Sequence, residues 1–175
     1  TATDTAALSG TYPKACKRKY WAKPLLNEEK HEIGLRILIR KIQLVASQYG
    51  KALTPIFSYA KDHYMRTFLL CEKSKEEVDK IIKQHDFYKE AGPLWTGQLW
   101  DNSLVKKMAQ NNKQQENRDF LNIIKGESAI NEIGFHDIHT ICKKEKTKTV
   151  PKKEDVIKKI KKLSYKAAST HFLPT

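Results

Sequence analysis

Cysteine is scarce in this sequence of 175 residues. The three cysteines, Cys16, Cys71 and Cys142, are odd in number and far apart, and none belongs to a C-x-x-C pair. This pattern argues against a disulfide framework and against a cysteine-ligated zinc site. We therefore expect reduced thiols and a cytoplasmic location.

Long hydrophobic runs and glycine-rich motifs are also absent. The mean hydropathy is −0.64, and no apolar run approaches the length of a membrane span. The seven glycines form no phosphate-binding loop after a strand, and the sequence has neither a nucleophile elbow nor an H-E-x-x-H metal motif. These absences argue against a membrane partner, a P-loop enzyme and a dinucleotide-binding fingerprint.

Positive charge is the strongest feature that is present. The chain has 33 Lys and Arg against 20 Asp and Glu, a net charge of +13. Residues 143–166 alone hold eleven lysines and three acids, a net charge of +8. A local excess of this size is typical of a protein that binds a polyanion. We expect a nucleic acid, with an acidic protein, a membrane surface or a simply soluble surface as alternatives.

The start of the chain predicts a strand end, a loop and a helix. Residues 1–3 are small and β-branched, like the end of a buried strand. Residues 5–23 contain turn-forming glycine and proline and predict a loop. Residues 27–48 predict a helix with Asn27 as its N-cap, because apolar residues recur at intervals of three and four.

Two strands and a boundary are expected next. Residues 53–59 and 64–71 are rich in β-branched, aromatic and aliphatic side chains, which favour strands. The link between them is so short that they must be antiparallel neighbours. The charged run over residues 72–80 is the candidate boundary between two domains, residues 1–72 and residues 73–175.

The second half predicts helices and a final strand. Helices are expected over residues 74–83, in one or two pieces over 103–125, and over 151–163, where Pro151 opens the helix. Residues 164–175 predict a strand. A helix, a helix and a strand with a basic face outline a winged-helix-like unit.

The segment KACKRKYW, residues 14–21, is a candidate site for nucleic acid. It interleaves four cations with Tyr20 and Trp21. Cations can meet phosphates, and aromatic rings can stack on exposed bases. The alternative is a surface loop whose two rings are tucked into the core.

Polar side chains elsewhere form three further candidates. Glu32 and Arg36 are spaced i,i+4 on one helix, as a surface ion pair or as part of a pocket if that face meets the loop after Asp4. His136 and His139 are an H-x-x-H pair on an expected helix; without cysteine partners, a capping or RNA-facing pair is favoured over a metal site. A corner between strands, where sites often gather, holds Asp62, His63, Tyr64 and Arg66.

The order of these segments resembles one known family. The chain contains TATD, YPKACKRKY, KPL, HEIGLRIL, SYAKDHYMR, GPLWTGQL, HDIH and STHFLPT, in that order and at matching spacing. Together they resemble the C-terminal half of archaeal-type tRNA (guanine-26, N2)-dimethyltransferases. The resemblance spans essentially the whole chain.

The resemblance implies an α/β fold that is only part of an enzyme. Residues 1–72 would complete the Rossmann-like sheet of a class I S-adenosylmethionine-dependent methyltransferase, and residues 73–175 would form a small α+β tRNA-binding domain. The cofactor-binding strands and the catalytic D-P-F-G-type motif would lie upstream of Thr1. We therefore expect a fragment, truncated at both ends, that has no catalytic residue of its own and is inactive alone.

The implied activity is transfer of one or two methyl groups from S-adenosylmethionine to N2 of guanine 26 in tRNA. The cofactor would be bound mainly outside this chain. The full-length protein would be a monomer without a DNA partner. A stand-alone basic RNA-binding module and a basic structural protein are the alternatives. Because residues 74–91 lack the cysteines of a zinc-binding-looking insertion that some family members carry, no metal is expected.

The resemblance also implies roles for single residues. The target guanine would meet a loop formed by Thr3, Asp4, Tyr12 and Tyr20. Glu32 and Arg36 would brace this loop, and Asp62, His63, Tyr64 and Arg66 would lie at the domain junction. The residues that would contact tRNA are Lys14, Lys17, Arg18, Lys19, Lys152, Lys153, Lys158, Lys159, Lys162, Thr170, His171 and Phe172.

Overall fold

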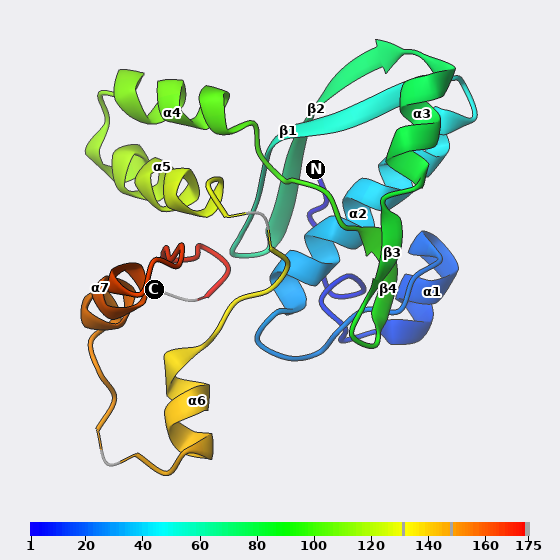
Figure 1. Ribbon diagram of the computed structural model, residues 1–175. Coiled ribbons are helices and arrows are strands. Elements are labelled where there is room, and N and C mark those ends of the chain that lie inside the picture. Colours follow the sequence, from blue (N-terminus) through cyan, green and yellow to red (C-terminus); the bar gives the residue numbers. More distant parts are fainter. Residues whose placement is uncertain (131, 148, 174–175) are drawn as a thin grey trace.

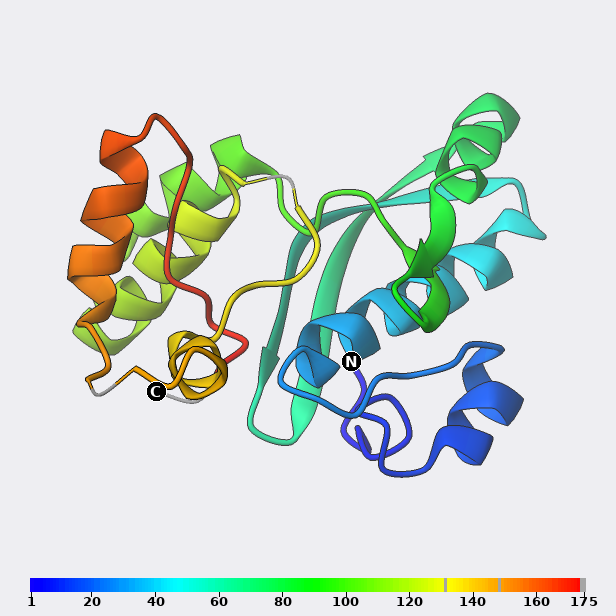
Figure 2. The same cartoon turned by 60° about the horizontal axis from the view of Figure 1, so that its bottom comes forward.

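The computed structural model describes residues 1–130, 132–147 and 149–173 and has a mixed α/β fold (Figure 1). Two antiparallel hairpins and three helices form one part, and four helices gather beside it (Figures 1 and 2). In chain order the elements are α1 (Pro13–Tyr20), α2 (Lys30–Ser47), β1 (Lys51–Lys61), β2 (Tyr64–Lys73), α3 (Lys75–Ile82), β3 (His85–Tyr88), β4 (Ala91–Trp95), α4 (Asn102–Asn111), α5 (Gln115–Glu127), α6 (Ile138–Lys144) and α7 (Lys153–Lys162). None of the helices in these described ranges is both long enough and apolar enough to cross a membrane.

Helix α2 is the centre of the core. Ile33, Leu35, Ile37 and Ile39 are fully buried in it, and both β1 and β4 pack against it. The predicted helix is confirmed, although it begins at Lys30 rather than just after Asn27. The Asn27 side chain still accepts a hydrogen bond from the Glu29 backbone at 2.9 Å, so it caps the turn that leads into the helix.

The first hairpin confirms the two predicted strands and places the start of the chain beside them. Strands β1 and β2 pair antiparallel, with a register shift between Pro55 and Phe57. Ala2 forms an isolated antiparallel bridge with Met65 through two backbone hydrogen bonds of 2.9 Å. The residues predicted to end a strand therefore do extend the pairing of this hairpin.

The prediction of a loop throughout residues 5–23 is wrong, because α1 lies within it. Pro13 occupies the first turn of this helix, where its missing N–H costs nothing. Trp21 ends the helix in the left-handed conformation, and its N–H donates to the Lys17 carbonyl at 3.0 Å. A helix of eight residues with one buried side chain, Cys16, is too short to show a clear apolar period.

The C-terminal part confirms the predicted helices but not the final strand. Residues 164–173 contain no strand, and residues 174–175 lie outside the described residues. The winged-helix-like ending is therefore wrong. The helix expected to carry both histidines begins after Asp137, which caps α6 by accepting from the N–H groups of His139 and Thr140. His136 precedes the helix, so the two histidines do not share a helix face.

The loop after Asp4 is seated directly on α2. Leu8 is fully buried, and it meets the helix at Gly34. A Cβ atom at Gly34 would lie 2.9 Å from the Leu8 carbonyl oxygen and 2.7 Å from the end of the Met65 side chain. The close approach of loop, helix and hairpin thus requires glycine at this position.

Replacing Gly34 with alanine tests this contact. We expect Gly34→Ala to lower the free energy of unfolding by about 1–2 kcal/mol, because overpacking costs about 1–3 kcal/mol and the gain in helix propensity returns at most about 1. Urea unfolding followed by circular dichroism measures the change. Gly126→Ala in α5, where the added atom would meet only the Ala168 side chain at 3.0 Å, should change stability less. A stabilised Gly34→Ala variant would contradict the close approach.

Candidate functional site

The start of the chain and the turn of the first hairpin lie at one edge of the molecule. Because Ala2 pairs with Met65, Thr3 and Asp4 lie beside the turn that precedes β2, and both are exposed. Burial, followed by the neighbouring Cys16 and Asp4, raises the pKa of Tyr20, which places this phenol near Asp4. Three of the four residues expected around the target base are thus close together. The fourth, Tyr12, is 62% exposed.

Helix α1 presents a basic face to solvent. Cys16 faces the core and Tyr20 packs against it, whereas the other long side chains of the helix are cationic. The Lys41 ammonium lies 3.0 Å from the centre of the Trp21 ring, a cation–π contact. Trp21 is 52% exposed, so the alternative of two rings in the core holds only for Tyr20, which packs against it. The exposed cations are those predicted to contact tRNA: Lys14, Lys17, Arg18 and Lys19.

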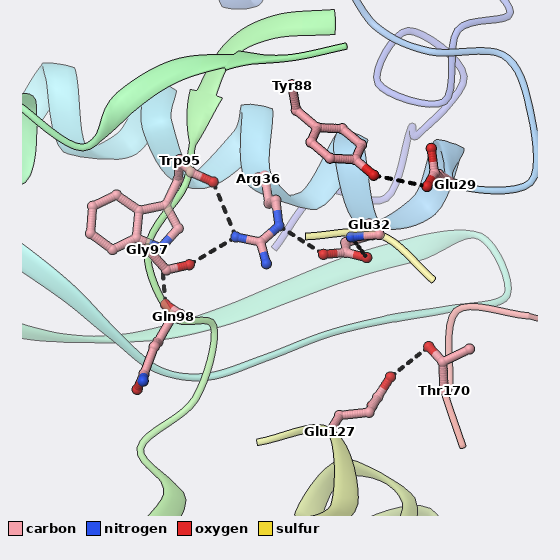
Figure 3. Close-up of polar contacts among 10 residues, drawn as sticks. Glu29, Glu32, Arg36, Tyr88, Trp95, Gly97, Gln98, Glu127 and Thr170 are labelled. Carbon is pink, nitrogen blue, oxygen red and sulfur yellow. Dashed lines mark hydrogen bonds and ion pairs between the residues drawn. The ribbon is translucent and has the colours of Figure 1, made fainter. Parts of the chain in front are cut away.

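Glu32 and Arg36 form a buried ion pair in α2 (Figure 3). Arg36 Nε donates to Glu32 Oε1 at 2.9 Å, and the two side chains are only 4–5% exposed. The other arginine donors reach the carbonyls of Trp95 and Gly97 at 3.1 and 2.8 Å. Glu32 Oε2 accepts from the Gly134 N–H at 3.1 Å. The expectation that this pair braces the loop after Asp4 is wrong, since its partners lie at the end of β4, just after that strand and before α6.

A second buried carboxylate near the start of α2, that of Glu29, is also paired with residues from a distant part of the chain. Glu29, 2% exposed, accepts from the Tyr88 hydroxyl at 3.1 Å and from the Lys89 ammonium at 2.7 Å (Figure 3). The hydrogen bond to Glu29 is the main reason that the pKa of Lys89 is raised. Nothing in the local sequence distinguishes Glu29 from the exposed Glu28 beside it, so its role could not be predicted.

The predicted junction residues gather at the β1–β2 turn. Asp62 has a φ of +50°, and Asp62 and His63 are both exposed. The Arg66 guanidinium lies 5.4 Å from the centre of the Tyr64 ring. Tyr59, beside Tyr64 on the paired strand, packs edge-on against Phe120 of α5 at 5.5 Å. The turn therefore does meet the helical part of the molecule.

The C-terminal segment is tied to α5 through Glu127 (Figure 3). The Thr170 hydroxyl and the His171 N–H both donate to Glu127 Oε1, at 2.5 and 3.1 Å. The Ala60 N–H donates to His171 Nε2 at 3.4 Å. Nδ1 of this ring therefore carries the proton and donates to Glu127 Oε2 at 2.5 Å. Glu127 thus anchors the segment at three points.

This burial disagrees with the expectation that the segment contacts the tRNA backbone. The His171 side chain is 2% exposed, and Phe172 is 4% exposed. The Phe172 ring stacks on Phe135 at 6.4 Å, and the His171 ring packs edge-on against Trp100 at 6.0 Å. Both side chains serve packing, in place of the strand that was expected here. Sequence reasoning missed Glu127 and Trp100, because their partners lie more than 40 residues away in the chain.

A groove of about 300 Å³ runs between the hairpin turn, α5 and the C-terminal segment. Predicted site residues from both halves of the chain, Asp62 and Thr170 to Phe172, meet in its lining. Its lining residues are His31, Ala60, Lys61, Asp62, Phe120, Ile123, Thr170, His171, Phe172 and Leu173.

Helix α7 carries the second basic face. Its apolar residues Val156, Ile157 and Ile160 are half-buried, as the predicted amphipathic pattern requires. The lysines on and just before the helix that were predicted to contact tRNA are exposed: Lys152, Lys153, Lys158, Lys159 and Lys162.

The buried Arg36 can be tested by mutation. We expect Arg36→Met to lower the free energy of unfolding by about 3–5 kcal/mol, because it leaves Glu32 as an uncompensated buried charge. Replacing both partners, as in Glu32→Met with Arg36→Met, should cost less than the single arginine change. Urea unfolding of the three proteins measures this coupling. A cost below about 1 kcal/mol for Arg36→Met, the range of an exposed ion pair, would contradict the assigned role.

Comparison with known proteins covers the whole chain. A family model described as N2,N2-dimethylguanosine tRNA methyltransferase matches residues 1–90 and 86–175. The chain is 38% identical to the tRNA (guanine(26)-N(2))-dimethyltransferase of Methanocaldococcus jannaschii and 36% identical to the tRNA (guanine(26)-N(2)/guanine(27)-N(2))-dimethyltransferase of Aquifex aeolicus. Each alignment covers 99% of this chain and 52% of the relative.

A solved structure is similar over the same extent. Trm1 from Pyrococcus horikoshii, determined with S-adenosyl-L-methionine, superposes with a TM-score of 0.87 at 32% identity, over 99% of this chain and 53% of that one. The chain thus spans about half the length of the curated relatives it matches. The resemblance noted in the sequence is confirmed as a family relationship: the chain belongs to the N2,N2-dimethylguanosine tRNA methyltransferase family.

Proposed function

We propose that this chain is the C-terminal half of an S-adenosylmethionine-dependent tRNA methyltransferase that acts on N2 of guanine 26. The observation that carries this proposal is the bridge between Ala2 and Met65. It supports a chain that enters as a strand antiparallel to β2 and continues that pairing upstream of Thr1. Phe68 and Leu70 of β2, 48% and 60% exposed, would then be covered by the rest of a class I methyltransferase sheet.

In this proposal the reaction takes place at the edge that holds Thr3 and Asp4. Open α/β sheets bind their ligands at the carboxyl ends of the strands, and the strand that enters at residues 1–3 ends here. The expected division at residues 72 and 73 does not separate the two parts of the fold, because α3 and β4 pack on α2; in this proposal the helical part, α4 to α7, acts on tRNA. We also propose that the full-length enzyme is cytoplasmic and monomeric.

We infer that the described residues of this chain do not by themselves build a site for S-adenosylmethionine. Thr3 and Asp4 are exposed, and the groove beside the hairpin turn is lined by other residues. We therefore place the cofactor and the catalytic residues outside this chain. The exocyclic amine of guanine is a poor nucleophile, because its lone pair is delocalised into the ring, so the enzyme must orient it and accept its proton. This chain would supply the side of the site that faces the RNA.

Two basic faces flank the proposed reaction edge. Figure 2 shows α1 on one side of the N-terminus and the hairpin turn, and α6 and α7 on the other. Exposed lysines and arginines bind phosphates with little dependence on sequence. An RNA held by both faces would cross the edge between them. A stand-alone RNA-binding module without catalysis is the second candidate, since the basic faces alone would account for it.

Methyl transfer separates the two candidates. With labelled S-adenosylmethionine and an unmodified tRNA transcript, we expect no transfer by this chain and N2-methylguanine at position 26 from a full-length enzyme that includes it. A tRNA with adenine at position 26 is the control. Transfer by this chain alone, or a full-length protein that methylates neither tRNA, would contradict the proposal.

The basic face of α7 gives a second test. Replacing Lys152, Lys153, Lys158 and Lys159 with alanine should weaken tRNA binding and reduce the slope of log K against log salt by about one for each lost phosphate contact. Fluorescence anisotropy at several salt concentrations measures both. The matched control removes the same charge from exposed lysines near α3, Lys51, Lys73, Lys75 and Lys83. Equal effects of the two sets would mean that α7 is not the RNA-binding face.

A further inference from the structure

The groove between the hairpin turn and the C-terminal segment is not used by any step described so far. Its volume, about 300 Å³, is at the lower end of the range of ligand sites in proteins. Residues from four separate parts of the chain line it: the first turn of α2, the end of β1, α5 and the C-terminal segment. Such convergence makes the groove dependent on the complete fold.

The walls of the groove are apolar and well fixed. Phe120 and Ile123 of α5 face Phe172 and Leu173 across it. The Phe120 ring is held edge-on by Tyr59 at 5.5 Å and by the His171 ring at 5.8 Å. Three hydrogen bonds from Thr170 and His171 to Glu127 hold the C-terminal wall in place. The aromatic surface is therefore organised before any ligand arrives.

Polar groups lie at the rim. Lys61 and Asp62 are exposed at the hairpin turn, and His31 lies at the start of α2. Burial, with a smaller contribution from Lys30, lowers the pKa of His31, which favours the uncharged ring with one donor and one acceptor nitrogen. An apolar slot with a cation, a carboxylate and an imidazole at its rim matches a flat heteroaromatic ring attached to a phosphate.

We propose that this groove receives one unstacked nucleobase of the bound RNA, next to the base that is methylated. The proposal rests on the proposed function and adds a contact to it. The half-buried ring of Phe120 provides the stacking surface, Asp62 accepts from amino or imino groups on the edge of the base, and Lys61 meets the adjoining phosphate. Charge favours RNA as the occupant, because the hairpin turn at the rim of the groove lies between α1 and α7 (Figure 2), and both helices carry exposed lysines.

The groove lies next to the proposed reaction edge. The hairpin turn that forms its rim is the same turn that lies beside Thr3 and Asp4. A base that must leave a helical stack for chemistry disturbs its neighbours, and unstacking costs free energy. A second pocket that holds a neighbouring base would offset part of this cost and fix the register of the RNA at the reaction edge.

Photochemical crosslinking tests the contact without altering the protein. A tRNA transcript containing 4-thiouridine is bound to the chain, irradiated and digested with trypsin. Cleavage at Arg118, Lys125 and Lys166 releases residues 119–125 and 167–175, which carry the α5 wall and the C-terminal wall. We expect RNA adducts on both peptides. Adducts confined to peptides from α1 and α7 would overturn the proposed groove while leaving RNA binding intact.

A variant whose groove is filled gives a second test of the inference. Ile123→Trp should occupy the groove, abolish the adducts on both peptides and weaken tRNA binding by about 5- to 100-fold, the range for one lost base stack. Asn122→Trp adds the same bulk at the neighbouring exposed position of α5 and should leave affinity and adducts unchanged. Unaltered binding by a folded Ile123→Trp variant would overturn the inference. Failure of the parent chain to bind tRNA would instead overturn the proposed function.

Discussion

The fold depends on satisfying polar groups buried within its central helix. Arg36 lies among Ile33, Leu35, Ile37 and Ile39, all fully buried, where an unpaired guanidinium would be very costly. Its donors are met by Glu32 and by the carbonyls of Trp95, the last residue of β4, and Gly97, and Glu32 in turn accepts from the N–H of Gly134. One ion pair therefore joins α2, the second hairpin and the segment that leads to α6. Glu29, at the start of the helix, also joins it to the second hairpin by accepting hydrogen bonds from Tyr88 and Lys89.

Glu127 plays the same part in the helical half of the molecule. It binds Thr170 and His171, and the other side of the His171 ring accepts from the backbone of β1. The C-terminal segment thus bridges α5 and the first hairpin without forming a strand. Polar bonds of this kind specify one arrangement of the parts, because each buried group has few alternative partners.

Local pattern predicted much of the fold and little of the candidate site. The period of α2, the strand-favouring composition of β1 and β2, and the extent of α3 depend on neighbours in sequence, so they could be inferred. Helix α1 was missed because one buried residue, Cys16, gives no period. The partners of Glu32 and Glu127 could not be inferred, since they lie 102 and 43–44 residues away. Exposure of the lysines on α1 and α7 followed from charge alone.

The division between buried and exposed charge also separates structure from function. The buried charges of Glu29, Glu32, Arg36 and Glu127 are committed to partners within the chain and are not available to a ligand. The exposed cations of α1 and α7 are not held in place in this way. A flexible surface lysine loses little free energy when its ammonium group exchanges water for a phosphate. In a protein with both buried and exposed charges, the exposed cations are therefore the ones that can bind a polyanion. In the function that we propose, that surface surrounds the hairpin turn, which is where the paired start of the chain and the aromatic groove meet.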